Sequence, residues 1–392
     1  MHNKKFWVYL TIFITLNTFL FIYLLLFNAT VPFSKFDYTV NAHHYFTDQR
    51  INGGGFNLLR ALGQYDAQWY LKIANEGYPK NPIDTNLSDK SELDGMSYAF
   101  FPFYPLVLSM VNFPIKNSDL AAFLLANLLM LANFVSLFIL IRNLSSENNA
   151  FKTIFLLFFF PFSIFYRSYF TEGLFLLLLV WFSYYVINKR WLLSALFLSL
   201  LLVTRPNGII LAPLFLFFLG KAYLYKEITM RTFLDSFVVS ILPFIGWLTL
   251  CFLYTGNAFY WFTIQSSWNI TQHGAFPLLH TISTLFHFFS LSWHQFHSSK
   301  IDVLTIVIVG IMLFCSRKKL KPELWLISLL LWLTPLLTKD TMSFTRYQII
   351  SFPLFMYLSQ ITNRTTYGIL LSIFCSGLFF LSLFFVNWYW VG

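Results

Sequence analysis

Long apolar segments separated by short polar turns run through almost the whole chain. The first, residues 6–27, contains no charged residue and as a helix would extend about 33 Å, enough to cross a membrane. Basic residues precede it as in a signal peptide, but its apolar part is too long and no small-residue cleavage site closes it. We interpret it as a retained anchor. Further spans are predicted near residues 120–141, 151–168, 171–188, 191–204, 208–220, 233–254, 301–315, 323–337, 348–362 and 367–388.

This pattern predicts an all-α integral membrane protein of about eleven transmembrane helices, folded as one domain over residues 1–392. The segments 191–204 and 208–220 are short, and we expect a hairpin that does not reach full membrane depth. Composition agrees, because 57% of the residues are hydrophobic and 11% are charged. A soluble domain needs roughly a quarter of its residues charged.

The net charge of +10 could indicate nucleic-acid binding. In a membrane protein, however, excess Lys and Arg usually reflects orientation and contact with lipid headgroups, so we expect no nucleic-acid partner. The three cysteines lie in apolar runs, make no ligand spacing, and are expected to be small buried hydrophobic residues: Cys251, Cys315 and Cys375.

Orientation depends on the apolar segment 98–113, which Pro102 and Pro105 interrupt. If it does not span, the basic turns around Arg142, Lys189 and Arg317 all face the cytoplasm, as short basic loops prefer. We adopt that topology. Residues 28–119 then form a long extracytoplasmic loop with surface helices. The segment 278–297, where His280, His287 and His294 recur every seven residues, is predicted to be an interfacial helix rather than a metal site using His294 and His297.

Under this topology the polar residues gather on the extracytoplasmic side, and no charged residue lies in the middle of a predicted span. A proton- or ion-coupled transporter normally has such groups near the bilayer midplane. A loop carboxylate near arginines instead suits an enzyme that handles a phosphate-linked substrate. Arginine binds phosphate oxygens at two points, and a carboxylate can take a proton from a hydroxyl nucleophile.

Four strings sharpen this hypothesis. In chain order they are QYDAQWYLKIANEGY at 64–78, AFFPFYPL at 99–106, FPFSIFY…YFTE at 160–172, and TRPNG at 204–208 followed by TRY at 345–347. Together they resemble the PIG-V family, the second mannosyltransferases of GPI-anchor synthesis and their bacterial relatives, in the GT-C glycosyltransferase superfamily. The resemblance covers about residues 60–360.

The resemblance implies a GT-C-like helical bundle, an extracytoplasmic site, a polyprenyl-phosphate hexose donor with mannose as the hexose, and inversion at the anomeric carbon. It implies Asp66 as the catalytic base. Around it we expect two groups of residues, one binding the donor (Glu172, Arg205, Arg346 and Tyr347) and one binding substrate (Trp69, Tyr70 and Tyr104). A divalent metal ion is compatible with this chemistry, although no ligand cluster in the sequence demands one.

This sequence departs from the family just before Asp66, where Gln64-Tyr65 stands in place of the expected Arg-Trp. Arg60, one helical turn earlier, could supply the missing charge. The expected partners are the lipid-linked sugar, a glycan or lipid acceptor, and membrane lipids. The short loops favour a bacterial plasma membrane, with the endoplasmic reticulum as the alternative.

Structural roles compete with each functional one. Asp66 could merely cap the helix that follows it. Trp69 and Tyr70 could be interface-belt aromatics, and Glu172 could pair with Arg167. Arg205 and Arg346 could extend to lipid headgroups. The alternative functions are a flippase or transporter for lipid-linked saccharides and a membrane scaffold without chemistry.

Overall fold

The computed structural model describes residues 2–43, 45–80, 95–265, 283–292, 299–337 and 343–392. This described part is all-helical, with 77% helix and no strand. The α-helices are α1 His2–Phe27, α2 Lys35–Asn41, α3 Leu58–Leu62, α4 Ala67–Glu76, α6 Phe103–Ile115, α7 Ser118–Leu144, α8 Glu147–Phe158, α9 Glu172–Ile187, α10 Trp191–Leu202, α11 Leu211–Leu224, α12 Met230–Thr255, α13 Tyr260–Thr263, α15 Lys300–Ser316, α16 Pro322–Leu336, α17 Phe344–Gln348, α18 Phe352–Leu358 and α19 Arg364–Val386.

Among the described residues, five helical segments are long and apolar enough to cross a membrane: 4–30, 118–144, 206–224, 230–255 and 364–386. The predicted helices near 171–188, 191–204 and 323–337 also form, but with 16, 12 and 15 residues they are shorter than a typical span. These features are compatible with a membrane protein. The count of about eleven spans stays a prediction.

Three predicted segments differ in detail. The helix expected over 151–168 ends at Phe158, and a turn follows that contains Pro161, which has no backbone N–H to continue the helix. The span expected over 348–362 is divided between α17 and α18, with Pro353 in the first turn of α18. Helical structure runs from 206 to 224, which is longer than the half-depth segment expected over 208–220. Half of the predicted interfacial helix over 278–297 lies outside the described residues, including His280, His294 and His297.

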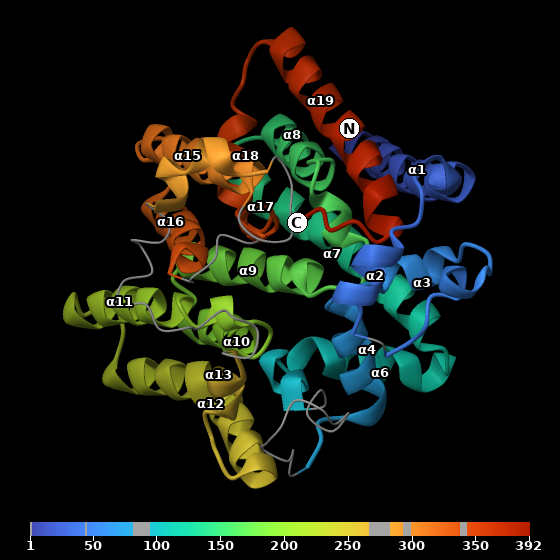
Figure 1. Ribbon diagram of the computed structural model, residues 1–392. Helices are drawn as coiled ribbons and strands as arrows, with labels where there is room; N and C mark the ends of the chain where they lie inside the picture. Colours follow the sequence, from blue (N-terminus) through green and yellow to red (C-terminus); the bar gives the residue numbers. More distant parts are fainter. Residues whose placement is uncertain (1, 44, 81–94, 266–282, 293–298, 338–342) are drawn as a thin grey trace.

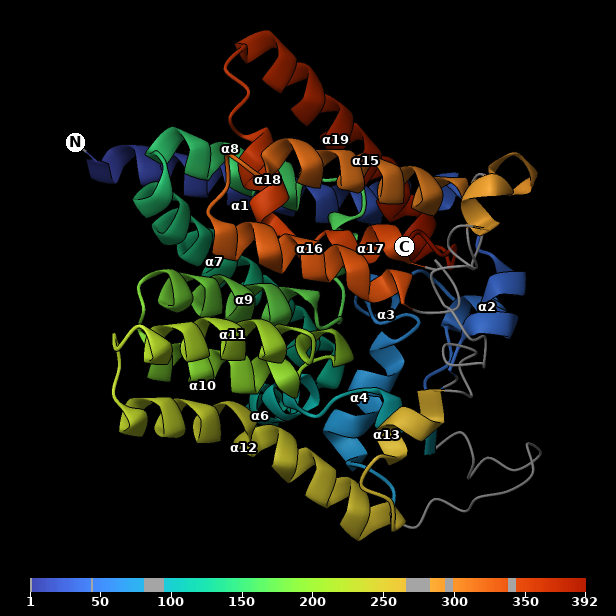
Figure 2. The same cartoon turned by 90° about the vertical axis from the view of Figure 1, so that its left-hand side faces the viewer.

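Most long helices lie roughly side by side, and the short helices α2, α3, α4 and α13 gather at one end of this bundle (Figures 1 and 2). In Figure 2 the turns that join α9 to α10, α11 to α12 and α15 to α16 lie at the left-hand end. Helices α2, α3, α4 and α13 lie toward the right. The left-hand turns carry basic clusters, and an ion pair of 2.8 Å between Lys189 and Glu227 joins two of them. These basic turns therefore lie at the end of the bundle away from α2, α3, α4 and α13.

Two close contacts hold neighbouring segments of the bundle together. The Asn133 side chain of α7 is fully buried and donates 2.8 Å hydrogen bonds to the carbonyls of Leu129 and Gly173, which joins α7 to the start of α9. At the turn after α10, a Cβ on Gly208 would overlap the carbonyl of Leu201. Only glycine fits there, as a hairpin turn at TRPNG requires.

Candidate active site

Glu172 lies at the centre of the candidate site. It is the first residue of α9 and is fully buried. The N-terminus of a helix carries partial positive charge, so a carboxylate is favoured at this position. Its Oε1 accepts a hydrogen bond of 2.6 Å from Nε of Arg346 and lies 2.7 Å from Nη1 of Arg205. The second contact is an ion pair between two buried side chains.

Arg346, on α17, links Glu172 to a second carboxylate. Its Nη1 donates a 2.8 Å hydrogen bond to Oδ2 of Asp66, 280 residues away in the sequence. The guanidinium also lies over the rings of Phe170 and Phe165, at 4.4 and 4.9 Å. Arg346 is 3% exposed, so it does not extend to lipid headgroups.

Two arginines and two carboxylates thus form one connected cluster from four distant parts of the chain. Burying a single charge would cost several kcal/mol, but here the formal charges cancel. Every carboxylate has an arginine partner within 2.8 Å. We call Asp66, Glu172, Arg205 and Arg346 the charge cluster.

Asp66 is the accessible member of the charge cluster. Its side chain is 29% exposed, whereas those of Glu172, Arg205 and Arg346 are at most 7% exposed. Asp66 precedes α4, but its backbone is already helical and its side chain caps no backbone N–H. The helix-cap interpretation is therefore wrong. The carboxylate turns instead toward Arg346.

The residue before Asp66 has an unusual backbone conformation. Tyr65 has φ of 53°, in the left-handed region that is unfavourable for a bulky residue. Its ring is buried against Trp388 and Trp390, with ring centroids 5.1 and 4.8 Å away. Trp388 is itself left-handed, with φ of 68°. This packing holds the turn that presents Asp66, at a backbone cost of about 1–3 kcal/mol per residue.

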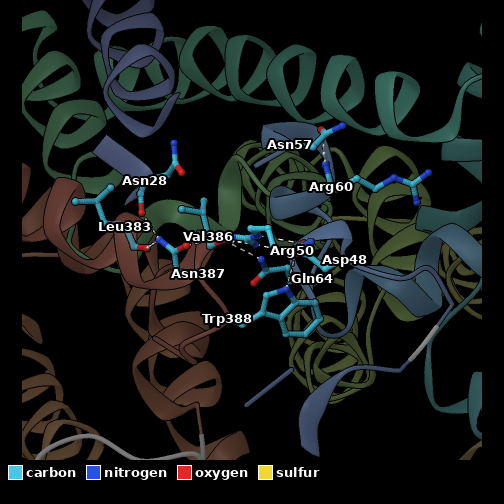
Figure 3. A network of polar contacts seen from close by, with 10 residues as sticks. All are labelled: Asn28, Asp48, Arg50, Asn57, Arg60, Gln64, Leu383, Val386, Asn387 and Trp388. Atoms are coloured by element: carbon cyan, nitrogen blue, oxygen red, sulfur yellow. Dashed lines mark hydrogen bonds and ion pairs between the residues drawn. The ribbon is translucent and has the colours of Figure 1, made fainter. Parts of the chain in front are cut away.

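A polar network behind this turn ties it to the end of α19 (Figure 3). Gln64 donates a 3.1 Å hydrogen bond to the carbonyl of Val386, and Arg50 donates to Val386 and to Asn387. Asp48 accepts from Arg50 and, at 3.0 Å, from the indole of Trp388. Gln64 therefore takes a structural place where the family resemblance led us to expect a basic residue.

Burial of the Asp48 carboxyl opposes its ionisation, but the hydrogen bonds and charge of Arg50 outweigh burial. Together they hold the pKa of Asp48 below its usual value. The carboxylate is thus charged at neutral pH and stabilises this network.

The aromatic residues expected to bind substrate form a buried layer beside the charge cluster. Trp69 is 3% exposed and stacks on Phe100 at a centroid distance of 5.7 Å. Tyr70 packs edge-on against Phe100 and Tyr104, and burial raises its pKa above the usual value. These residues are buried, so they do not form an interface belt. The hydroxyl of Tyr104 is buried without a hydrogen-bond partner in the described part of the chain.

Tyr347 lies next to Arg346 in the sequence, but its ring contacts the other arginine. The guanidinium carbon of Arg205 lies 5.3 Å from the centroid of the Tyr347 ring. Arg205 is 6% exposed, so it too is unavailable to lipid headgroups. The structure therefore places all four expected donor-binding residues together.

Two expected ion pairs do not form. Arg167 is fully buried, but its guanidinium donates to Asn17 Oδ1 and to the carbonyls of Ser163 and Phe158 rather than to Glu172. Glu172 is already occupied by Arg205 and Arg346.

Arg60 does not compensate for the missing basic neighbour of Asp66. Its Nε lies 2.7 Å from Oδ2 of Asp119, at the start of α7. In Figure 3 its side chain points away from Arg50 and Gln64.

No protein-family model and no curated protein sequence significantly matches this chain. In the part of the chain that the structure describes, no group of three or more His, Cys, Asp or Glu residues could hold a metal ion. Both carboxylates of the charge cluster are directed to arginines, an arrangement that does not match a metal ligand set.

Proposed function

We propose that this protein is a membrane glycosyltransferase that moves a hexose, mannose by resemblance, from a polyprenyl-phosphate donor to an acceptor hydroxyl. The observation that carries the proposal is the charge cluster, in which one accessible carboxylate lies beside two buried arginines. A scaffold would gain little from this arrangement, because apolar residues stabilise a core as well as a buried ion network does. We place the site on the extracytoplasmic face of a bacterial plasma membrane.

In the proposed reaction, Asp66 acts as the general base. Its second oxygen, Oδ1, has no hydrogen-bond partner among the described residues and is free to accept the proton of an acceptor hydroxyl. As that proton moves to Asp66, the hydroxyl oxygen attacks the anomeric carbon. The bond from that carbon to the phosphate oxygen breaks, and the polyprenyl phosphate leaves with the electron pair. Attack opposite the leaving group inverts the configuration.

The two arginines would stabilise the leaving phosphate. Within the described residues, Nη2 of Arg346 and Nη2 of Arg205 have no hydrogen-bond partner, so each can donate to a phosphate oxygen. Glu172 would hold both guanidinium groups by their other nitrogens and so fix their orientation. Arginines positioned in advance stabilise developing negative charge without reorganising during the reaction.

The test is a transfer reaction by the purified protein in proteoliposomes. Incubation with a radiolabelled polyprenyl-phosphate mannose and membrane acceptor lipids should yield a labelled product of inverted configuration. A nucleotide sugar in place of the lipid donor should give none. Movement of the lipid-linked sugar across the bilayer without formation of a glycoside would instead support a flippase.

A further inference from the structure

A pocket of about 490 Å³ lies apart from the charge cluster, where α3, α4 and the start of α7 meet. Its lining is mostly polar. Two side chains that line it, Asn75 and Asn117, are exposed, so the pocket opens to the surface. The polar residues that line it are Tyr45, Arg60, Asn75, Asn117, Ser118 and Asp119.

One wall is a chain of hydrogen bonds among neutral groups. The amide of Asn75 donates to the hydroxyl of Tyr45 at 3.0 Å and accepts from Ser118 at 2.8 Å. Asn112, which does not line the pocket, donates to Asn75 and Ser118 at 3.1 and 3.2 Å. Such a network fixes the direction of each donor and acceptor before any ligand arrives.

The pocket is also lined by an ion pair that packs on an aromatic ring. Nε of Arg60 lies 2.7 Å from Asp119, and its guanidinium carbon lies 4.6 Å from the centroid of the Phe46 ring. The terminal nitrogens of Arg60 have no other partner in the described structure, and the side chain is 41% exposed. Leu71 adds an apolar surface.

The combined chemistry favours a neutral polyhydroxyl ligand. An anion would face the Asp119 carboxylate, and a cation would face the Arg60 guanidinium. Sugar hydroxyls both donate and accept, so they can use an amide, a carboxylate and a guanidinium at once. Phe46 and Leu71 offer apolar surface to the C–H face of a sugar ring.

The position of the pocket separates it from the site of transfer. Asp66 precedes α4 and Asn75 lies near its end, about 13 Å further along the axis. At 3.6 residues per turn, nine residues correspond to two and a half turns, so the two side chains leave opposite faces of the helix. A ligand in the pocket therefore cannot be the sugar that reacts at Asp66.

We propose that this pocket is a second saccharide-binding site, which holds a neutral part of the acceptor glycan away from the reacting hydroxyl. Its assignment to the acceptor rests on the proposed transfer function, whereas saccharide binding itself does not. The site would restrict the enzyme to acceptors that already carry a glycan.

The test is saturation-transfer NMR with neutral mannopentaose and the full-length protein, in a detergent without a sugar headgroup. The wild type should bind the probe, and Asn75→Ala should bind it about tenfold more weakly, since the remaining amide N–H of Asn75 is lost together with the hydrogen bonds that orient Tyr45 and Ser118. Asn149→Ala is the matched control, because this surface asparagine bonds to Ser145 outside the pocket. Tyr45→Phe provides a milder second variant, which removes one hydroxyl and keeps the ring.

Wild-type protein that does not bind mannopentaose would overturn the proposal. So would equal binding by the wild type, Asn75→Ala and Tyr45→Phe. Binding should survive Asp66→Asn. If the wild type binds the probe but transfers no sugar, the proposed glycosyltransferase function fails and the saccharide site stands.

Discussion

The substitution Glu172→Gln separates charge from shape at the centre of the charge cluster. Glutamine has nearly the same volume as glutamate but carries no charge. Of the two carboxylates that balance Arg205 and Arg346, only that of Asp66 then remains. Removing one partner of a buried ion pair typically costs about 3–5 kcal/mol of folding free energy. Because Glu172 is fully buried and contacts both arginines, we expect a loss in that range.

The measurement is the free energy of unfolding of the purified protein in detergent micelles, from denaturant titration. Glu227→Gln is the matched control. Glu227 lies 2.8 Å from Lys189, nearly the same separation, but these side chains are 41% and 62% exposed. An exposed pair typically contributes about 0–1 kcal/mol, so the control should change stability little.

Adding Arg205→Met to Glu172→Gln removes the excess cation and should restore part of the lost stability. Equal destabilisation by Glu172→Gln and Glu227→Gln would contradict a stabilising ion pair at Glu172. So would a further loss of stability equal to the full individual effect of Arg205→Met, since that would show no coupling between Glu172 and Arg205.

Three further predictions follow from the site and the bundle. Arg346→Lys should weaken binding of the polyprenyl-phosphate donor about tenfold in a direct binding assay, because lysine keeps the charge but loses the two-point geometry; unchanged affinity would remove Arg346 from the donor site. The pKa of Asp48 is lowered by folding, so its stabilising effect is present above the usual value and lost as pH falls. The difference in unfolding free energy between the wild type and Asp48→Asn should therefore be largest at neutral pH and shrink below about pH 4; a pH-independent difference would contradict this. In a background without native cysteines, Lys189→Cys should react with an impermeant reagent only after permeabilisation and Lys116→Cys without it, and labelling of Lys189→Cys in intact cells would invert the topology.

The sequence pattern predicts most helices, because apolar length and turn residues are local signals. It does not predict the end of α8 at Phe158 or the break between α17 and α18. In both places the sequence stays apolar, and a proline follows the break, in the turn after α8 and in the first turn of α18. Glu172, Arg205, Arg346 and Asp66 could each be proposed as site residues from motifs. Their pairing could not, since local spacing favoured Arg167 for Glu172 and Arg60 for Asp66.

The residues that hold the turn before Asp66 could be predicted even less well from the sequence. Asp48 and Trp388 lie 340 residues apart, and no local pattern connects them. Tyr65 and Trp388 adopt left-handed backbone conformations that neither residue type favours. Only tertiary packing determines such conformations, so they emerge from the structure alone.

The most direct test of the central claim is sugar transfer by Asp66→Asn. Asparagine keeps the shape of the side chain and can still accept a hydrogen bond from Arg346, but it removes the basicity. We expect normal expression and donor binding with transfer slowed roughly 100-fold or more. Glu76→Gln is the control, because Glu76 is on the same helix, is 53% exposed, and contacts Lys72 at 3.9 Å and the hydroxyl of Tyr45 rather than a member of the charge cluster; it should transfer at the wild-type rate. Transfer by Asp66→Asn at the rate of Glu76→Gln would contradict the assignment of Asp66 as the base.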